Sequence, residues 1–377
     1  MSRYSDVVLS APALAATPAS AAFPPLPPVD WGQIDKKPPA AVAVAYRGPE
    51  APLPRADVAI LTWTSAEWSA LDHVFLGSGS AGARSPYELG SGWYLYGLNA
   101  AGLATDNPLA PLWGYYNLVE VGAGSEGLLV LLFKSDAHLA HPPWIAGLEQ
   151  LLGQILDDSE VAWVYSVGTA GGSAESERLG DIVVTNSAHI QLKNPGNLGA
   201  PIDNQTFTCG AFPSTRVVEE AQQLLFPLGT VVTDAALASL VQQLHAQVPD
   251  SVPFGLADLL NSSLGPENLD QPTPRPKPDV PLLTTDFYFI ASGDDAAQWA
   301  VLEMDDAVIA SVAGERDRKY AFVRNISDPI VPELASHGRL IPASVRDRWS
   351  GLIYENYGLF TSFNGAIVAW AAIAGGD

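Results

Sequence analysis

The chain has 377 residues, of which 47% are hydrophobic, so it is long enough to bury a large core in one domain or two. Its 41 acidic and 19 basic residues give a formal net charge of −22, which argues against nucleic acid or an anionic membrane surface as a partner. The single cysteine, Cys209, excludes an intrachain disulfide and a cysteine-based zinc site, and it fits a cytoplasmic location. No apolar run approaches the roughly 20 residues that span a bilayer.

The N-terminal part of the chain, residues 1–55, is an Ala- and Pro-rich arm without a sustained hydrophobic period. Such a composition predicts a disordered or extended segment. Its first residues resemble an export signal only faintly, because the basic region holds Arg3 alone and Asp6 follows it. We therefore expect order to begin at Ala56 and one domain to occupy residues 56–377.

From residue 56 onward, short apolar runs alternate with segments of helical period. The first pair is a buried strand at 56–63 and a helix in which Trp68, Leu71 and Phe75 recur at helical spacing. Further strands are predicted at 128–133, 161–167, 181–185, 287–291 and 320–326, and further helices at 144–156, 215–226, 233–245, 304–313 and 355–374. This alternation predicts an α/β fold, with a central mixed, mostly parallel sheet flanked by helices.

Two long insertions interrupt this alternation, at residues 77–120 and 194–285. The first is rich in Gly, Tyr and Trp and is predicted to be an excursion with a hairpin. The second contains the proline-rich stretch 271–281, which must be extended because its alternate prolines fix φ and remove donors. We expect that stretch to be a surface strap.

Two segments, 164–186 and 302–328, combine strands with glycine and acidic residues. In the first, the small residues Thr169, Ala170 and Gly171 follow an apolar strand, where a backbone can approach a ligand closely. The second has acids at a helix start and Asp328 at a strand end. Together they predict a cleft formed by loops at the strand ends of the sheet.

Five short motifs follow one another in a fixed order along the chain. A strand followed by an acid precedes GTAGG with LGDIVV, then SGD, then EMDDAVIA, then VRNISD, between residues 57 and 328. This order resembles the purine nucleoside phosphorylase and nucleosidase superfamily, and most closely its 5′-methylthioadenosine/S-adenosylhomocysteine nucleosidase branch. The resemblance covers about residues 57–374. It implies one α/β domain with a partly barrel-like sheet, cleavage of a nucleoside's N-glycosidic bond, and a homodimer or higher homo-oligomer.

The resemblance implies two catalytic acids. Cleavage of a purine–ribose bond passes through an oxocarbenium-like sugar and leaves negative charge on the base. Asp328 would protonate the base, with Ser327 orienting it, and Glu67 would activate water. The residues themselves also fit simpler interpretations: Asp328-Pro329 as a strand-ending turn, and Glu67 as an acid stabilised at a helix start.

The same resemblance implies the substrate contacts. Asp305 stands where the family has a glutamate that binds the ribose hydroxyls, with Met304 under the ribose and Glu303 as an added contact. Asp is one methylene shorter, so the ribose contact must be rebuilt. Residues 169–171 would line the floor of the pocket.

Base stacking is a second departure from the family pattern. Ala296 stands where the family commonly has an aromatic residue. Three aromatic side chains are candidates to replace it: Phe287, Phe289 and Trp299. The sequence does not distinguish among them. We name Phe289 as the expected contact with the base.

The loop after the first strand, residues 62–67, favours water over phosphate as the attacking group. It has a carboxylate, which repels phosphate, and it lacks the glycine, proline and arginine of a phosphorylase loop. Phosphate-dependent cleavage remains the alternative, and the substrate is either a purine nucleoside or a nucleotide. Candidate cations for a nucleotide's phosphate are Lys134, Lys193, Arg216 and residues 316–319.

Two interpretations without catalysis stay open. The chain is then a silent nucleoside sensor, or a partner-binding protein that uses its arm and strap. No His/Cys/acid spacing resembles a metal-ligand set, so neither a metal nor an organic cofactor is expected.

Overall fold

The computed structural model describes residues 25–77, 93–97, 112–122, 127–139, 144–174, 176–193, 202–265, 269–287 and 296–376. Several sequence predictions fall partly or wholly outside these residues. They include the first 24 residues of the N-terminal arm, most of the predicted insertion at 77–120, parts of the insertion at 194–285, the SGD motif and the predicted contact Phe289.

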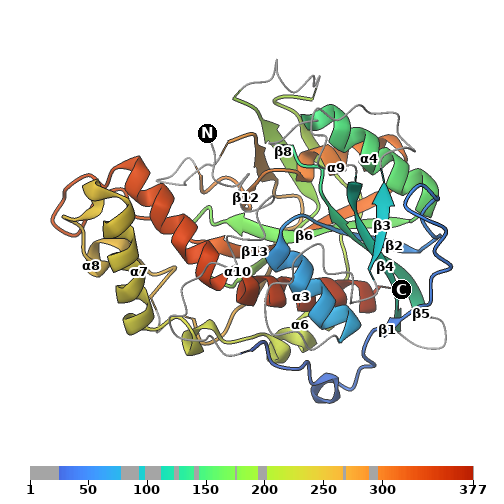
Figure 1. The fold of residues 1–377 in the computed structure, drawn as a ribbon, viewed down its shortest axis with the longest axis horizontal. Helices are drawn as coiled ribbons and strands as arrows, with labels where there is room; N and C mark the ends of the chain where they lie inside the picture. Colours follow the sequence, from blue (N-terminus) through green and yellow to red (C-terminus); the bar gives the residue numbers. More distant parts are fainter. Residues whose placement is uncertain are drawn as a thin grey trace.

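Four parallel strands form the centre of a 13-stranded sheet (Figure 1). In spatial order they are β5 (Gly127–Ser135), β2 (Val58–Thr62), β6 (Trp163–Gly171) and β13 (Lys319–Asp328). Every residue of β2 is buried, as expected for a parallel strand covered on both faces. The predicted α/β class, with a mostly parallel central sheet flanked by helices, is confirmed.

The sheet forks at β6, which pairs with β2, with β13 and, through Gly171, with β12. One branch continues from β13 to β7 (Ile182–Thr185) and β10 (Pro274–Pro276). The other runs from β12 (Leu302–Glu303) through β11 (Leu282–Thr285) and β8 (Ser187–Gln191) to β9 (Thr206–Thr208). At the opposite edge, β4 (Leu112–Gly122) pairs antiparallel with β5, β3 (Tyr94–Gly97) and β1 (Ala40–Ala41).

Helices cover both faces of the sheet, and alternate residues of β2 show the division. Val58 and Ile60 pack into the core shared with α3, α6, α7 and α10, whereas Ala59 and Leu61 pack into the core shared with α4 and α9. Figure 1 shows α10 beside α3, and α4 beside α9.

The α-helices are α3 (Ser65–Leu76), α4 (Trp144–Ser159), α6 (Arg216–Ala221), α7 (Asp234–Gln247), α8 (Leu256–Leu259), α9 (Asp306–Glu315) and α10 (Ala343–Ala374). Short 3-10 helices are η1 (Trp31–Ile34), η4 (Gln222–Leu224), η5 (Leu228–Thr230) and η6 (Pro249–Ser251).

The C-terminal helix is longer than the sequence predicted. It starts at Ala343 rather than near residue 355 and has 32 residues. By length and mean hydropathy α10 matches a membrane-spanning helix, but 94% of its most apolar 18-residue window is buried inside the protein. It is therefore the central helix of one of the two cores.

Other elements differ from expectation. The strand predicted at 287–291 lies outside the described residues except for Phe287, and a strand that was not predicted, β11, occupies Leu282–Thr285. The helix predicted at 215–226 ends at Ala221 and is followed by the 3-10 helix η4. The helix predicted from residue 304 begins at Asp306. The proline-rich segment is extended and lies largely at the surface, as predicted, and Pro274–Pro276 also pairs with β7 as the parallel strand β10. Edge strands tolerate proline because one side needs no N–H donors.

The described part of the N-terminal arm is extended and packed against the domain. Leu26 and Leu53 are buried, and β1 pairs with β4 at the sheet edge. The carbonyl of Pro27 also lies 2.8 Å from His73 Nε2 on α3. Residues 25–55 thus add to the core rather than forming a separate unit.

Candidate active site

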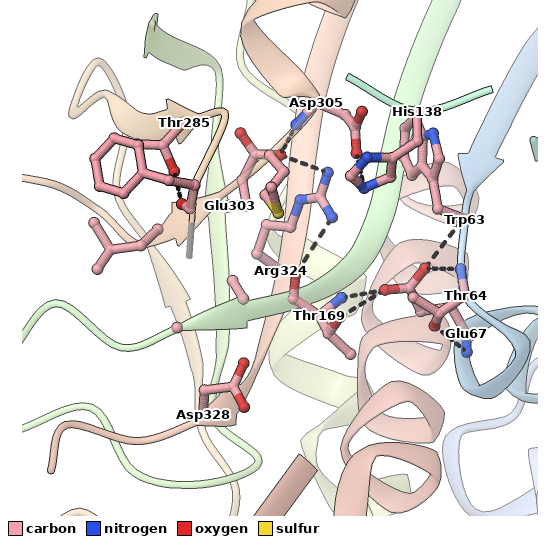
Figure 2. Close-up of a pocket in the computed structure, with 15 residues that line it drawn as sticks. Trp63, Thr64, Glu67, His138, Thr169, Thr285, Glu303, Asp305, Arg324 and Asp328 are labelled. Atoms are coloured by element: carbon pink, nitrogen blue, oxygen red, sulfur yellow. Dashed lines mark hydrogen bonds and ion pairs between the residues drawn. The ribbon is translucent and has the colours of Figure 1, made fainter. Parts of the chain in front are cut away.

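One pocket opens at the carboxyl ends of β2, β5, β6, β11, β12 and β13 (Figure 2). It holds about 590 Å³ of empty space, counting its open mouth. Loops at strand ends that meet at one edge of an α/β sheet are where such folds bind ligands. Residues 169–171 and 303–305, together with Glu67 and Asp328, all line it. The structure therefore brings eight of the ten predicted site residues together.

The remaining two predicted residues are Ser327 and Phe289. Ser327 is fully buried behind Asp328, and its Oγ lies 3.3 Å from Asp328 Oδ2. Phe289 lies outside the described residues.

Glu67 sits in the first turn of α3 and its carboxyl group is surrounded by donors. Oε2 accepts hydrogen bonds from Trp63 N at 3.0 Å and Thr64 N at 2.8 Å, and from the Thr62 hydroxyl. Oε1 accepts from the backbone N and the hydroxyl of Thr169, both at 2.7 Å. Glu67 therefore caps the helix and also joins β2 to the pocket floor on β6.

These donors decide the charge of Glu67. Burial would raise the pKa of its carboxyl, but the Arg324 guanidinium and the bonds from Thr169 and Thr64 hold that pKa below its usual range. Glu67 is thus ionised at neutral pH. Glu67 does lie at a helix start, as the simpler interpretation held, and it also lies in the pocket wall.

Asp328 ends β13 on the other side of the floor. A register shift between Ile326 and Asp328 precedes it, and its carbonyl accepts a hydrogen bond from Gly172 N at 2.8 Å. Its side chain is buried in the pocket wall. The strand does end at the Asp-Pro dipeptide, and the carboxyl group of its last residue lies in the pocket wall.

Arg324 is a pocket residue to which the sequence analysis gave no role. Its Nε lies 2.7 Å from Asp306 Oδ2, and its Nη2 donates to Ser166 Oγ at 2.6 Å and to Glu303 Oε2 at 3.3 Å. A buried guanidinium needs such partners. The signal was present in the sequence, because Arg324 directly follows the apolar run 320–323 within a strand, and a buried strand holds a charge only when it is paired.

Glu303 serves mainly as a cap for α9. Its Oε2 accepts from Asp305 N at 2.6 Å and Asp306 N at 3.0 Å, and its Oε1 accepts from the Thr284 hydroxyl. Burial and the neighbouring Asp306 raise the pKa of this carboxyl to about 8. Donors from the protein occupy most lone pairs of the Glu303 carboxyl group. Fewer lone pairs therefore remain for a ribose hydroxyl than the sequence suggested.

Asp305 points toward the loop after β5, as Figure 2 shows. Its Oδ1 accepts a hydrogen bond from Leu139 N at 2.9 Å, and its Oδ2 lies 3.1 Å from His138 Nε2. His138 also lines the pocket. Its position just after a predicted strand indicates that it can reach the pocket, since parallel strand ends converge, although a lone histidine is more often structural.

Of the three candidates for base stacking, Phe287 lines the pocket. Lys193 Nζ lies 5.6 Å from the centroid of its ring. Trp299 instead stacks on His189, with ring centroids 4.9 Å apart. Phe287 is therefore the one of these three candidates that the structure places at the pocket.

Within the part of the chain that the structure describes, no group of three or more His, Cys, Asp or Glu residues is arranged to hold a metal ion. The pocket is a site of carboxyl groups with one guanidinium and one imidazole.

Neither a protein-family model nor a curated protein sequence matches the chain. Among solved structures, it is similar to a mutant 5′-methylthioadenosine nucleosidase of Helicobacter pylori with 5′-methylthioadenosine in its active site, at 11% identity and a TM-score of 0.42 over 84% of this chain and 98% of that one. It is also similar to the S-adenosylhomocysteine nucleosidase of Streptococcus pyogenes, at 12% identity and a TM-score of 0.43 over 85% of this chain and 98% of that one. A third is the nucleosidase of Colwellia psychrerythraea in complex with adenine, at 14% identity and a TM-score of 0.36 over 84% of this chain and 98% of that one.

Proposed function

We propose that this protein hydrolyses the N-glycosidic bond of a purine nucleoside and releases the free base. One observation carries the proposal: the pocket holds the ionised Glu67 and a second acid, Asp328, on either side of a floor of small residues, 169–171 (Figure 2). Glycosidic hydrolysis uses two carboxyl groups that flank the bond to be cleaved. The motif order described above supports the same assignment.

Each acid has one task in the reaction. As the carbon–nitrogen bond breaks, its electron pair goes to the base, and protonated Asp328 gives the base a proton. The sugar is left as an oxocarbenium-like cation. A water molecule then forms a bond to the anomeric carbon and gives its proton to Glu67, at a lone pair freed when the hydroxyl of Thr62 or Thr169 turns away from the carboxylate. One nucleoside and one water yield one free base and one ribose.

The low pKa of Glu67 suits this order of events. A weak base is sufficient when water attacks a carbon that already carries positive charge. The carboxylate also stabilises that positive charge through space, because the pocket is partly desolvated. Thr169, which donates two hydrogen bonds to Glu67, holds the carboxylate against the floor.

The charges of the pocket favour water over phosphate. Among the described lining residues Arg324 is the sole Lys or Arg, and its guanidinium already contacts Asp306 and Glu303. A phosphate dianion would also meet the carboxylate of Glu67 at close range. This arrangement favours hydrolysis over phosphorolysis.

The same charges favour a nucleoside over a nucleotide. Lys134 was a candidate phosphate ligand, but it is buried and paired with Asp136. Arg316 lies 3.0 Å from Asp157, away from the pocket lining. A cytoplasmic location remains an expectation from the single cysteine, and a homo-oligomeric assembly remains an expectation from the family resemblance. The chemistry above depends on neither.

The test is free-base release from adenosine, inosine, methylthioadenosine, AMP and ATP, each with and without phosphate, followed by chromatography. Base released without phosphate supports the nucleosidase, and base released only with phosphate replaces it with a phosphorylase. No release, combined with thermal stabilisation by one of the compounds, makes the protein a nucleoside sensor. An Asp328→Asn preparation serves as the control for contaminating nucleosidases.

A further inference from the structure

Behind the pocket floor, the sheet forks at the last residue of β6. Gly171 pairs with Leu302 on β12 and with Asp328 on β13, and the next residue, Gly172, donates a backbone hydrogen bond to Asp328 O at 2.8 Å. Beyond this fork the two branches of the sheet separate. The spacing between Asp328 and the pocket wall formed by β12 therefore depends on what holds the fork.

A buried carboxylate, Glu177, closes the turn that follows β6. Its Oε2 accepts hydrogen bonds from Ser173 N at 2.6 Å and Ala174 N at 3.3 Å. Only 1% of its side chain is exposed. The hydroxyl of Ser173 donates to Trp299 O at 2.6 Å, in the segment that leads into β12. The turn after the floor is thus bonded both to Glu177 and to the start of the β12 wall.

Lys277 brings a cation to this turn from a third segment of the chain. It directly follows β10, and its backbone N donates to Val184 O on β7 at 2.8 Å. Its Nζ pairs with Glu177 Oε1 and donates to Ala300 O at 3.1 Å. A buried carboxylate needs such a partner, because an unpaired buried charge is strongly destabilising. One ammonium group therefore links the turn after the floor with the segment before β12.

We propose that Glu177 and Lys277 are positioning residues for the reaction, and that their ion pair sets the spacing between Asp328 and the wall formed by β12. This inference rests on the function proposed above. Neither residue lines the pocket, so their effect passes through the backbone of the turn and of residues 299–300. A displacement of about 1 Å caused far from the chemistry can lower a rate about 100-fold. The proline-rich segment thereby contributes to catalysis without contacting a substrate.

The strand β10 carries a second ion pair that serves as a matched control. Arg275 Nε lies 2.7 Å from Asp181 Oδ2, and the two side chains are 28% and 0% exposed, against 27% and 1% for Lys277 and Glu177. Arg275 also donates to Ser176 O at 2.9 Å. Among the described residues, its hydrogen bonds reach neither the segment before β12 nor the amides of the turn that Glu177 binds. Its loss removes a comparable ion pair from the same strand and leaves the fork bonded.

The experiment compares Lys277→Met with Arg275→Met in base release and in urea unfolding. We expect similar falls in the urea midpoint, because each variant leaves a buried carboxylate without its cation. We expect kcat to fall about 10- to 100-fold in Lys277→Met and less than about threefold in Arg275→Met, with KM changed only a few-fold in both. Lys277→Arg, which keeps a cation with several donors, should recover most of the lost kcat.

A double-mutant cycle tests whether Glu177 and Lys277 act as one unit. Glu177→Gln keeps an oxygen for Ser173 N but removes the buried charge, so a later loss of Lys277 leaves no carboxylate unpaired. The double variant should therefore lose less kcat than the product of the two single losses. Single losses that multiply independently would overturn the pairing.

The inference is also overturned if Lys277→Met and Arg275→Met lose the same kcat, because activity would then follow stability alone. Wild-type turnover by Lys277→Met would overturn it too. Far-ultraviolet circular dichroism establishes that each variant is folded. If Lys277→Met is not folded, Lys277→Gln takes its place, since its amide still donates hydrogen bonds but carries no charge.

A measurement without substrate separates this inference from the proposed function. Hydrogen–deuterium exchange, followed by mass spectrometry, reports how often the backbone amides of residues 172–174 open. These amides should exchange faster in Lys277→Met than in the wild type or in Arg275→Met, and equal rates would contradict the inference. A wild type that releases no base from any nucleoside refutes the proposed function, and the exchange rates then decide alone whether the ion pair holds the fork.

Discussion

The two walls of the pocket treat the same chemical group in opposite ways. On the wall formed by β2 and β6, Glu67 is buried among five hydrogen-bond donors, and its pKa is lowered. On the wall formed by β12, Glu303 and Asp305 are buried beside other acids, and the pKa of each is raised to about 8. Burial is similar on both sides, so the partners decide the proton state. The chain thus places charged and neutral carboxyl groups within a single pocket.

The largest effect is expected from Asp328→Asn. An amide cannot protonate the leaving base, so we expect kcat to fall by about 10²- to 10⁴-fold while the Kd for a nucleoside changes only a few-fold. Base release and calorimetry measure the two quantities. Asp157→Asn, on an exposed side chain, is the control. Wild-type turnover by Asp328→Asn would remove this residue from the mechanism.

Replacing Arg324 tests how much its guanidinium stabilises the buried carboxyl groups of Glu303 and Asp306. Arg324→Met leaves Asp306 and Glu303 buried without their cation, and we expect the free energy of unfolding to fall by about 3–5 kcal/mol. Urea unfolding measures the loss. Arg316→Met breaks an exposed ion pair with Asp157 and should cost about 1 kcal/mol or less. Similar losses in the two variants would contradict a special role for Arg324.

Glu67→Gln tests the role of the ionised carboxylate in the wall formed by β2 and β6. The amide NH₂ would face donors that now bind a carboxylate oxygen, so we expect a loss of about 1–3 kcal/mol in unfolding free energy. Hydrolysis should also slow by about 100-fold or more, because the charge and the water's proton acceptor are lost. Glu355→Gln, in an exposed pair with Arg348, controls for the removal of a surface charge. If Glu67→Gln instead leaves the rate unchanged and phosphate stimulates the wild type, the reaction is phosphorolysis.

The smallest effect is the pH dependence of stability. The folded-state pKa values of Glu303 and Asp305 are raised, so their contribution is present below about pH 4 and is lost as the pH rises through about 8. His138, whose pKa is lowered to about 4, contributes in the opposite sense, and only between about pH 4 and 6.5.

Stability should therefore fall between pH 6.5 and 8.5, where only the two carboxyl groups change. Urea midpoints at these two pH values measure this fall. Asp305→Asn should make it smaller, with the remainder due to Glu303. If the stability of Asp305→Asn falls as much as that of the wild type, Asp305 does not contribute to the pH dependence.

The residues of both pocket walls were largely readable from the sequence, but the partners of Asp305 in the wall formed by β12 were not. The strand at 56–63 and the helix after it are local patterns, and they place Glu67 correctly. Motif order placed residues 169–171 and Asp328 at the same pocket. These predictions succeed because each depends on one strand and the few residues that follow it.

The pairing of Asp305 with the loop at His138 and Leu139 joins positions 166 residues apart, measured between Leu139 and Asp305. No local period encodes such a contact. The early start of α10 was missed for a different reason. Its first turns carry Arg346, Asp347 and Arg348, whose polarity hides the apolar face that Val345 and Trp349 bury.

The strand β10 gives the pocket floor a distant anchor. Lys277, just after β10, pairs with Glu177, and Glu177 Oε2 accepts a hydrogen bond at 2.6 Å from Ser173 N, directly behind the floor glycines. Arg275 fixes the same strand to the buried Asp181. The floor is therefore tied to a segment about a hundred residues later in the chain. A protease that cuts the proline-rich segment would loosen the floor without touching a single pocket residue, so the integrity of this segment sets how rigidly the pocket can hold a ligand.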